Sequence, residues 1–86
     1  MVPVTIRTKP DRDGTIHERQ NLHVVKLMGN VIGFIYERED NTRHMYYGIM
    51  KNTVLIMDNI EYDMGNDFKR KKFKEDFLVL NALDRL

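Results

Sequence analysis

The residues best suited to chemistry form a basic run near the C-terminal end of the sequence. Five of the 14 basic residues fall within six positions, namely Lys69, Arg70, Lys71, Lys72 and Lys74. A helix is expected to begin just before them, and a helix N-terminus already carries about half a positive elementary charge. Cations and free backbone N–H groups together suit phosphate. The run therefore predicts contact with nucleic-acid phosphates. The alternatives are a solvated surface paired with nearby carboxylates and a contact with an acidic protein.

A second candidate group lies on an expected hairpin of residues 31–50. Arg43, His44 and Tyr46 bring cations beside aromatic rings there. Antiparallel sheets that bind single-stranded RNA stack bases on such rings and hold phosphates with such cations. Ordinary cross-strand packing is the more common reason for aromatic residues at these positions. These three residues are therefore secondary candidates for the same interface.

Acidic residues in the same region support a rival hypothesis. Glu37, Glu39 and Asp40 gather at the expected turn of this hairpin. Carboxylates in this arrangement can imitate a nucleic-acid backbone, so the chain would be a protein-interaction module that inhibits a host enzyme or toxin. The two hypotheses are compatible if the partner is itself bound to RNA.

The residue types argue against an enzyme. The chain has no Ser and no Cys, which removes two common nucleophiles, and it has no glycine-rich nucleotide-binding motif. The histidines, His17, His23 and His44, do not follow a metal-ligand spacing. The sequence predicts a non-enzymatic binding protein with no cofactor and no metal.

In size, composition and lack of catalytic groups the chain resembles the small accessory proteins of tailed phages. Its single Ala is at position 82, whereas Asn, Lys, Ile and Asp are plentiful. The resemblance involves no motif. It implies a protein of host takeover or anti-defence that acts by binding a host protein or nucleic acid.

The elements that position these residues follow from hydrophobic patterning. Alternating or continuous apolar segments predict strands at about 2–8, 15–28, 31–37, 43–50 and 53–58. Gly29 and Asn30 fit a two-residue hairpin turn. Asn66 or Asp67 can cap a helix running to about residue 85. The expected fold is α+β, an antiparallel meander of about five strands with one C-terminal helix packed on it.

Length and composition limit the number of domains, the size of the core and the cellular location that we expect. A chain of 86 residues supports one domain with a thin core, and no linker divides it. The apolar run 31–36 exceeds what one helix can cover, so a homodimer is expected. Without a signal peptide or a membrane-spanning stretch, the protein is expected to be soluble and cytoplasmic, in a bacterial host cell if a phage encodes it.

Overall fold

The structure, a computed structural model, describes residues 2–29, 31–37, 42–49 and 51–84, which form six strands and one helix. The elements in chain order are β1 (Pro3–Thr8), β2 (Glu18–Met28), β3 (Val31–Glu37), β4 (Arg43–Ile49), β5 (Thr53–Met57), β6 (Ile60–Asp63) and α1 (Asp67–Asp84). The predicted α+β class, with antiparallel strands and a single C-terminal helix, is confirmed.

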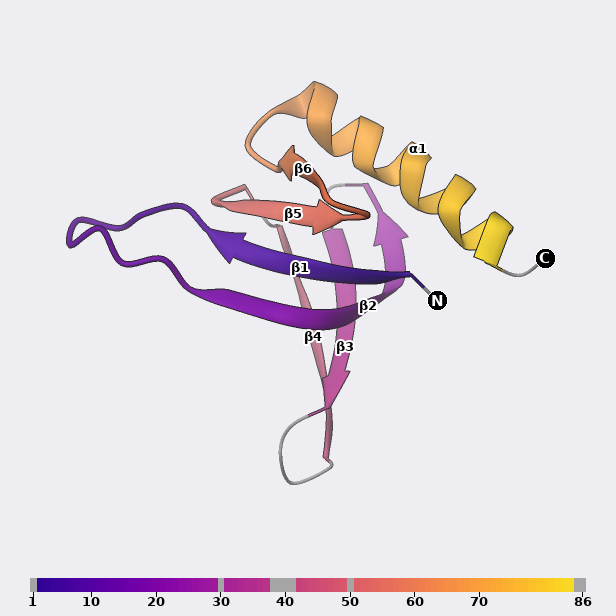
Figure 1. The fold of residues 1–86 in the computed structure, drawn as a ribbon, viewed down its shortest axis with the longest axis horizontal. Coiled ribbons are helices and arrows are strands. Elements are labelled where there is room, and N and C mark those ends of the chain that lie inside the picture. Colours follow the sequence, from indigo (N-terminus) through magenta and orange to yellow (C-terminus); the bar gives the residue numbers. More distant parts are fainter. Residues whose placement is uncertain (1, 30, 38–41, 50, 85–86) are drawn as a thin grey trace.

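The strands form an antiparallel sheet in the order β4-β3-β2-β1-β5-β6. The first four strands follow the chain as a meander. β5 then returns to pair with β1, so that Ile6 lies opposite Leu55. β6 is not among the five strands expected from the sequence. Figure 1 shows α1 across the β5–β6 end of the sheet, while the β3–β4 hairpin projects away from α1.

Left-handed backbone conformations explain how the hairpins close. Met28 pairs with Val31 across the predicted two-residue turn, in which Gly29 has φ 58°. Asp58 and Asn59 have φ of 53° and 63°, as a two-residue type I′ turn between β5 and β6 requires. Asp and Asn tolerate this conformation better than other side chains do.

β2 is bent where its pairing with both neighbours shifts register. One shift lies beside Asn21, whose φ is 59°, and the other lies between Val24 and Lys26. A bulge bends a strand and increases its twist. In Figure 1, β3 and β4 accordingly run across the direction of β1.

The core lies between the sheet and α1. Phe73 is fully buried, and its ring meets the Tyr62 ring edge-on with 5.4 Å between centroids. Phe77 stacks beside Phe73 one helical turn later. The other buried members of this cluster are Val4, Leu22, Val24, Ile32, Leu55, Met57 and Met64. The single described helix, α1, does not combine the length and apolar character that crossing a membrane requires.

The apolar run 31–36, on which the expected homodimer was based, is only partly visible. Ile32 and Gly33 are buried. The side chains of the other four residues of the run lie outside the described part of the chain. Dimerisation through this run therefore stays a prediction.

Candidate functional site

A basic hollow of about 540 Å³ lies between the start of α1 and the turn that connects β4 to β5. Its lining residues are Lys51, Asp67, Arg70, Lys71 and Lys74. One carboxylate among four cations leaves three formal positive charges around this space. Lys71 and Lys74, together with Asp67 and Arg70, share one side of the helix because they are three or four residues apart.

Lys51 reaches this hollow because several chain segments meet just before the helix. Lys9 N donates to Asn52 O at 3.0 Å, and Met64 N donates to Thr53 O at 3.0 Å. A Cβ placed on Gly65 would be only 3.0 Å from the Lys51 carbonyl oxygen. The lack of a side chain at Gly65 thus lets the turn with Lys51 approach the start of α1.

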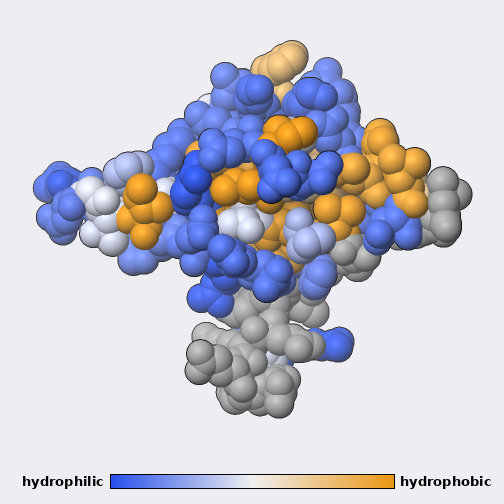
Figure 2. Space-filling model, in the orientation of Figure 1, coloured by the Kyte–Doolittle hydropathy of each residue, from blue (hydrophilic) through white to orange (hydrophobic). Residues whose placement is uncertain are grey.

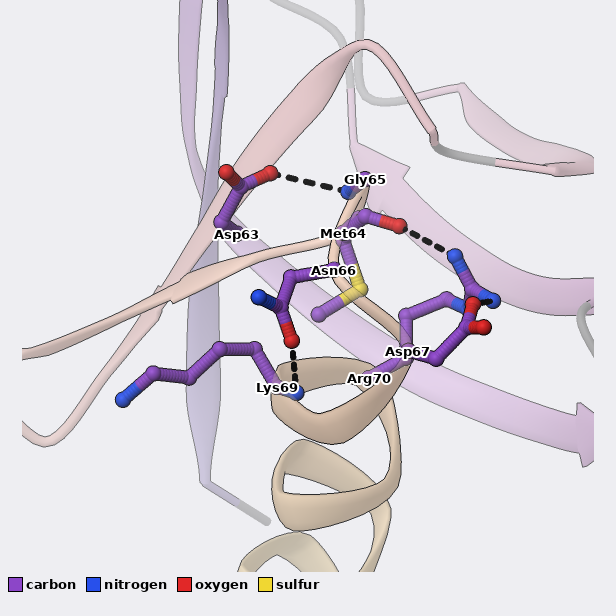
Figure 3. Close-up of polar contacts among 7 residues, drawn as sticks. All are labelled: Asp63, Met64, Gly65, Asn66, Asp67, Lys69 and Arg70. Atoms are coloured by element: carbon purple, nitrogen blue, oxygen red, sulfur yellow. Dashed lines mark hydrogen bonds and ion pairs between the residues drawn. The ribbon is translucent and has the colours of Figure 1, made fainter.

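The first turn of α1 is fixed by polar side chains from the preceding residues. Asn66 Oδ1 accepts a hydrogen bond from Lys69 N at 3.0 Å, which confirms Asn66 as the cap (Figure 3). Asp63 accepts from Gly65 N and pairs with Lys9, each at 2.8 Å. The hydrogen bond from Lys9, followed by the one from Gly65, lowers the pKa of Asp63.

Arg70 has a different environment from the lysines of the basic run. It is buried, and its guanidinium donates to the Met64 carbonyl at 2.7 Å and to the Asp67 carboxylate. Figure 3 shows the Arg70 and Lys69 side chains pointing to opposite sides of the helix start. Arg70, expected to contact phosphate directly, instead belongs to the floor of the hollow and ties α1 to the end of β6.

The remaining lysines of the run divide between two sides of α1. Lys72 Nζ pairs with Asp76 Oδ1 at 3.0 Å, one helical turn along. Successive residues of a helix are rotated by about 100°. Lys69 and Lys72 therefore face away from Lys71 and Lys74. The run is not one continuous basic surface, and only Lys71 and Lys74 join Lys51 as the exposed or half-buried cations of the hollow.

The other predicted residues lie elsewhere. Arg43 and His44 begin β4, about 20 Å along the strand from the end that leads to Lys51. The His44 ring is 2.9 Å from the Thr42 hydroxyl. Tyr46 pairs with Phe34 through its backbone, but its side chain lies outside the described residues. Arg43 and His44 are thus not part of the basic hollow, and the role of Tyr46 stays a prediction.

The acidic residues of the rival hypothesis are largely beyond what the structure describes. Glu37 ends β3, where its backbone lies opposite Arg43. Glu39 and Asp40, and the side chain of Glu37, lie outside the described residues. The acidic-loop hypothesis stays a prediction.

Tyr62 links the sheet to the helix through a buried hydroxyl. Its Oη donates to Asp76 Oδ2 at 2.7 Å, while Lys72 holds the other oxygen of the same carboxylate. Tyr62→Phe is expected to lower the free energy of unfolding by about 1–2 kcal/mol, because the ring stays buried but a hydrogen bond to an ionised group is lost. Denaturant unfolding at neutral pH measures this loss, and an unchanged midpoint would contradict it.

The same hydrogen bond makes stability depend on pH. Burial, followed by the hydrogen bond to Asp76, raises the pKa of Tyr62 from 10.0 to about 12. Because its pKa is raised, neutral Tyr62 stabilises the fold fully below about pH 10. This stabilisation is lost as the pH rises through about 12. Bonds from Tyr62 and Lys72 lower the pKa of Asp76, whose contribution is lost as the pH falls below its ordinary value of 3.8. Between pH 10 and 12, the Tyr62→Phe variant should therefore lose less thermal stability than the native protein does. Thermal unfolding of both proteins over this pH range measures the difference.

The site holds charges suited to binding an anion. Lys51, Lys71 and Lys74 have no ion pair with any carboxylate in the described part of the chain. No group of three or more His, Asp or Glu side chains that could hold a metal occurs among the described residues. Lys51 was missing from the sequence-based candidates because its place in the hollow depends on a contact between residues far apart in the chain.

No protein-family model matches the chain, and no curated protein or solved structure is significantly similar to it.

Proposed function

We propose that the protein is a non-enzymatic nucleic-acid-binding protein, with RNA as the favoured ligand, and that it seats backbone phosphates in the basic hollow. The observation that supports this is the meeting of Lys51, Lys71 and Lys74 without a carboxylate partner among the described residues. Three like charges held together repel one another, and an anion relieves that repulsion. Lysine binds phosphate as a point charge without requiring a fixed geometry. Such contacts hold a backbone without reading its sequence.

The hollow also explains which part of the basic run is best placed for binding. Lys71 and Lys74 line the hollow together with Lys51, whereas Lys72 lies on another side of α1, where it pairs with Asp76. Arg70 neutralises Asp67, which would otherwise repel a phosphate at the same place. Binding therefore depends on the three lysines directly and on Arg70 through Asp67.

Replacing Lys51, Lys71 and Lys74 by Gln is expected to remove most of the salt dependence of RNA binding. Three phosphate contacts on a single strand give a log–log salt slope of about −2 for the native protein. Its affinity should then fall about twentyfold between 50 and 200 mM salt. Fluorescence anisotropy with a labelled single-stranded RNA, repeated over this range, measures both quantities.

Lys69→Gln is the matched control, since Lys69 is an exposed lysine of the same run on the other side of the helix. Lys69→Gln should change the log–log salt slope by less than replacement of Lys51, Lys71 or Lys74 by Gln does. A triple variant with the native affinity and slope would overturn the assignment of the hollow. A native protein that binds neither RNA nor DNA, and that purifies without nucleic acid when no nuclease is used, would overturn the proposed function and would favour a protein partner instead.

A further inference from the structure

The outward face of α1 is more apolar than a solvated helix requires. Phe68 is 71% exposed, and Leu78, Val79 and Leu83 are 58–63% exposed. These side chains point away from the core, because Phe73 and Phe77 occupy the opposite face. Figure 2 shows hydrophobic surface gathered over the C-terminal half of α1. A small protein that leaves several large apolar side chains in water along one helix presents an interaction surface.

The order of residues along this face identifies the partner that it fits. Positions 68, 72, 75 and 79 follow one another at spacings of four, three and four, and so form one stripe along the helix. The stripe consists of Phe68, Lys72, Glu75 and Val79, that is, apolar, positive, negative and apolar. This order is self-complementary when reversed. An antiparallel copy of the same stripe places Phe68 against Val79 and Lys72 against Glu75, twice by symmetry.

We propose that two copies of this chain associate through antiparallel pairing of the outward stripe of α1. The contact is isologous, as a two-fold dimer requires. Parallel pairing would instead place Lys72 on Lys72 and Glu75 on Glu75. Lys72 is available for this role because its side chain is 50% exposed although it also pairs with Asp76 within the chain.

The size of the stripe limits the affinity. α1 has 18 residues and is therefore about 27 Å long. One helix face from each copy buries less than the roughly 800 Å² per partner of a standard interface. We expect a dimer in reversible exchange with monomer at micromolar concentrations. The stripe includes none of the three lysines of the hollow, so this inference and the proposed function can fail separately.

The first test is sedimentation of the full chain over about 1 µM to 1 mM. The native protein should shift from monomer to dimer within this range, while Phe68→Glu and Val79→Glu should each remain monomeric. Ile16→Glu is the control, because Ile16 is 50% exposed in the connection between β1 and β2, and it should dimerise as the native protein does. A native protein that is monomeric throughout, or a dimer that both stripe variants leave intact, would overturn the proposal.

A charge exchange tests the antiparallel arrangement itself. Lys72→Glu or Glu75→Lys alone should weaken the dimer about tenfold or more, because each puts like charges opposite one another. An equimolar mixture of the two variants should recover association, since every stripe charge then meets its opposite in the heterodimer. Circular dichroism of each variant at low concentration checks that α1 is intact. A mixture no stronger than either variant alone would rule out this pairing.

Discussion

Phe73→Ala is expected to lower the free energy of unfolding by about 3–5 kcal/mol. Phe73 is fully buried at the point where α1 meets the sheet, between the rings of Tyr62 and Phe77. Removing its ring leaves a cavity that two aromatic neighbours and the backbone of β6 can fill only in part. A domain of 86 residues has a total stability of about 4–13 kcal/mol, so the variant would be close to unfolding.

The matched control is Phe68→Ala, the same substitution five positions earlier on the same helix. Phe68 is 71% exposed, so its replacement should change the stability of the monomer by less than about 0.5 kcal/mol. Thermal unfolding at low protein concentration, where self-association does not contribute, compares the two. A midpoint for Phe73→Ala within a few degrees of the native value would contradict the core position, because the expected shift exceeds about 12 °C.

Local signals in the sequence predicted most of the elements. Alternation and turn residues placed the ends of the five strands within one residue of those observed, except that β2 starts three residues later than expected. Asn66 was correctly identified as a possible helix cap. These features depend on a few neighbouring residues. They can be predicted because period, turn chemistry and capping act over one or two turns of chain.

Features that depend on which strands pair with one another could not be predicted in the same way. Nothing within residues 53–57 indicates that β5 pairs with β1 rather than β4, since an antiparallel strand fits either neighbour. β6 was missed although Asp58 and Asn59 were a usable hairpin signal, because only two of its four residues, Ile60 and Tyr62, are apolar. Both pairings decide where the helix starts, and hence where the basic run lies.

The surroundings of the single side chains in the basic run could not be predicted from the sequence either. Five neighbouring cations are alike in sequence, but the helix rotates them to different surroundings and only two of the lysines line the hollow. Lys51, which completes the hollow, comes from the turn before β5 and lies outside the run. A binding site assembled from segments about 20 residues apart cannot be predicted from a charge run alone.

Arg70→Met is expected to lower the free energy of unfolding by about 2–3 kcal/mol. The guanidinium is buried and donates to the Met64 carbonyl at 2.7 Å as well as to Asp67. Methionine keeps much of the stem volume but leaves that carbonyl without its charged donor. Lys71→Met, next in sequence but exposed, should stay within about 0.5 kcal/mol of the native protein. Denaturant unfolding of the two variants gives the comparison.

The two bonds of Arg70 can be separated with Asp67→Asn. Asp67 is 91% exposed, so its pairing with Arg70 is screened by water, and the substitution should cost less than about 1 kcal/mol, including its favourable charge at the helix start. Most of the loss in Arg70→Met then comes from the bond to Met64, which joins α1 to the end of β6. If Asp67→Asn costs as much as Arg70→Met, the ion pair is what holds Arg70. If neither variant changes the midpoint, the two bonds of Arg70 do not stabilise the join between α1 and β6.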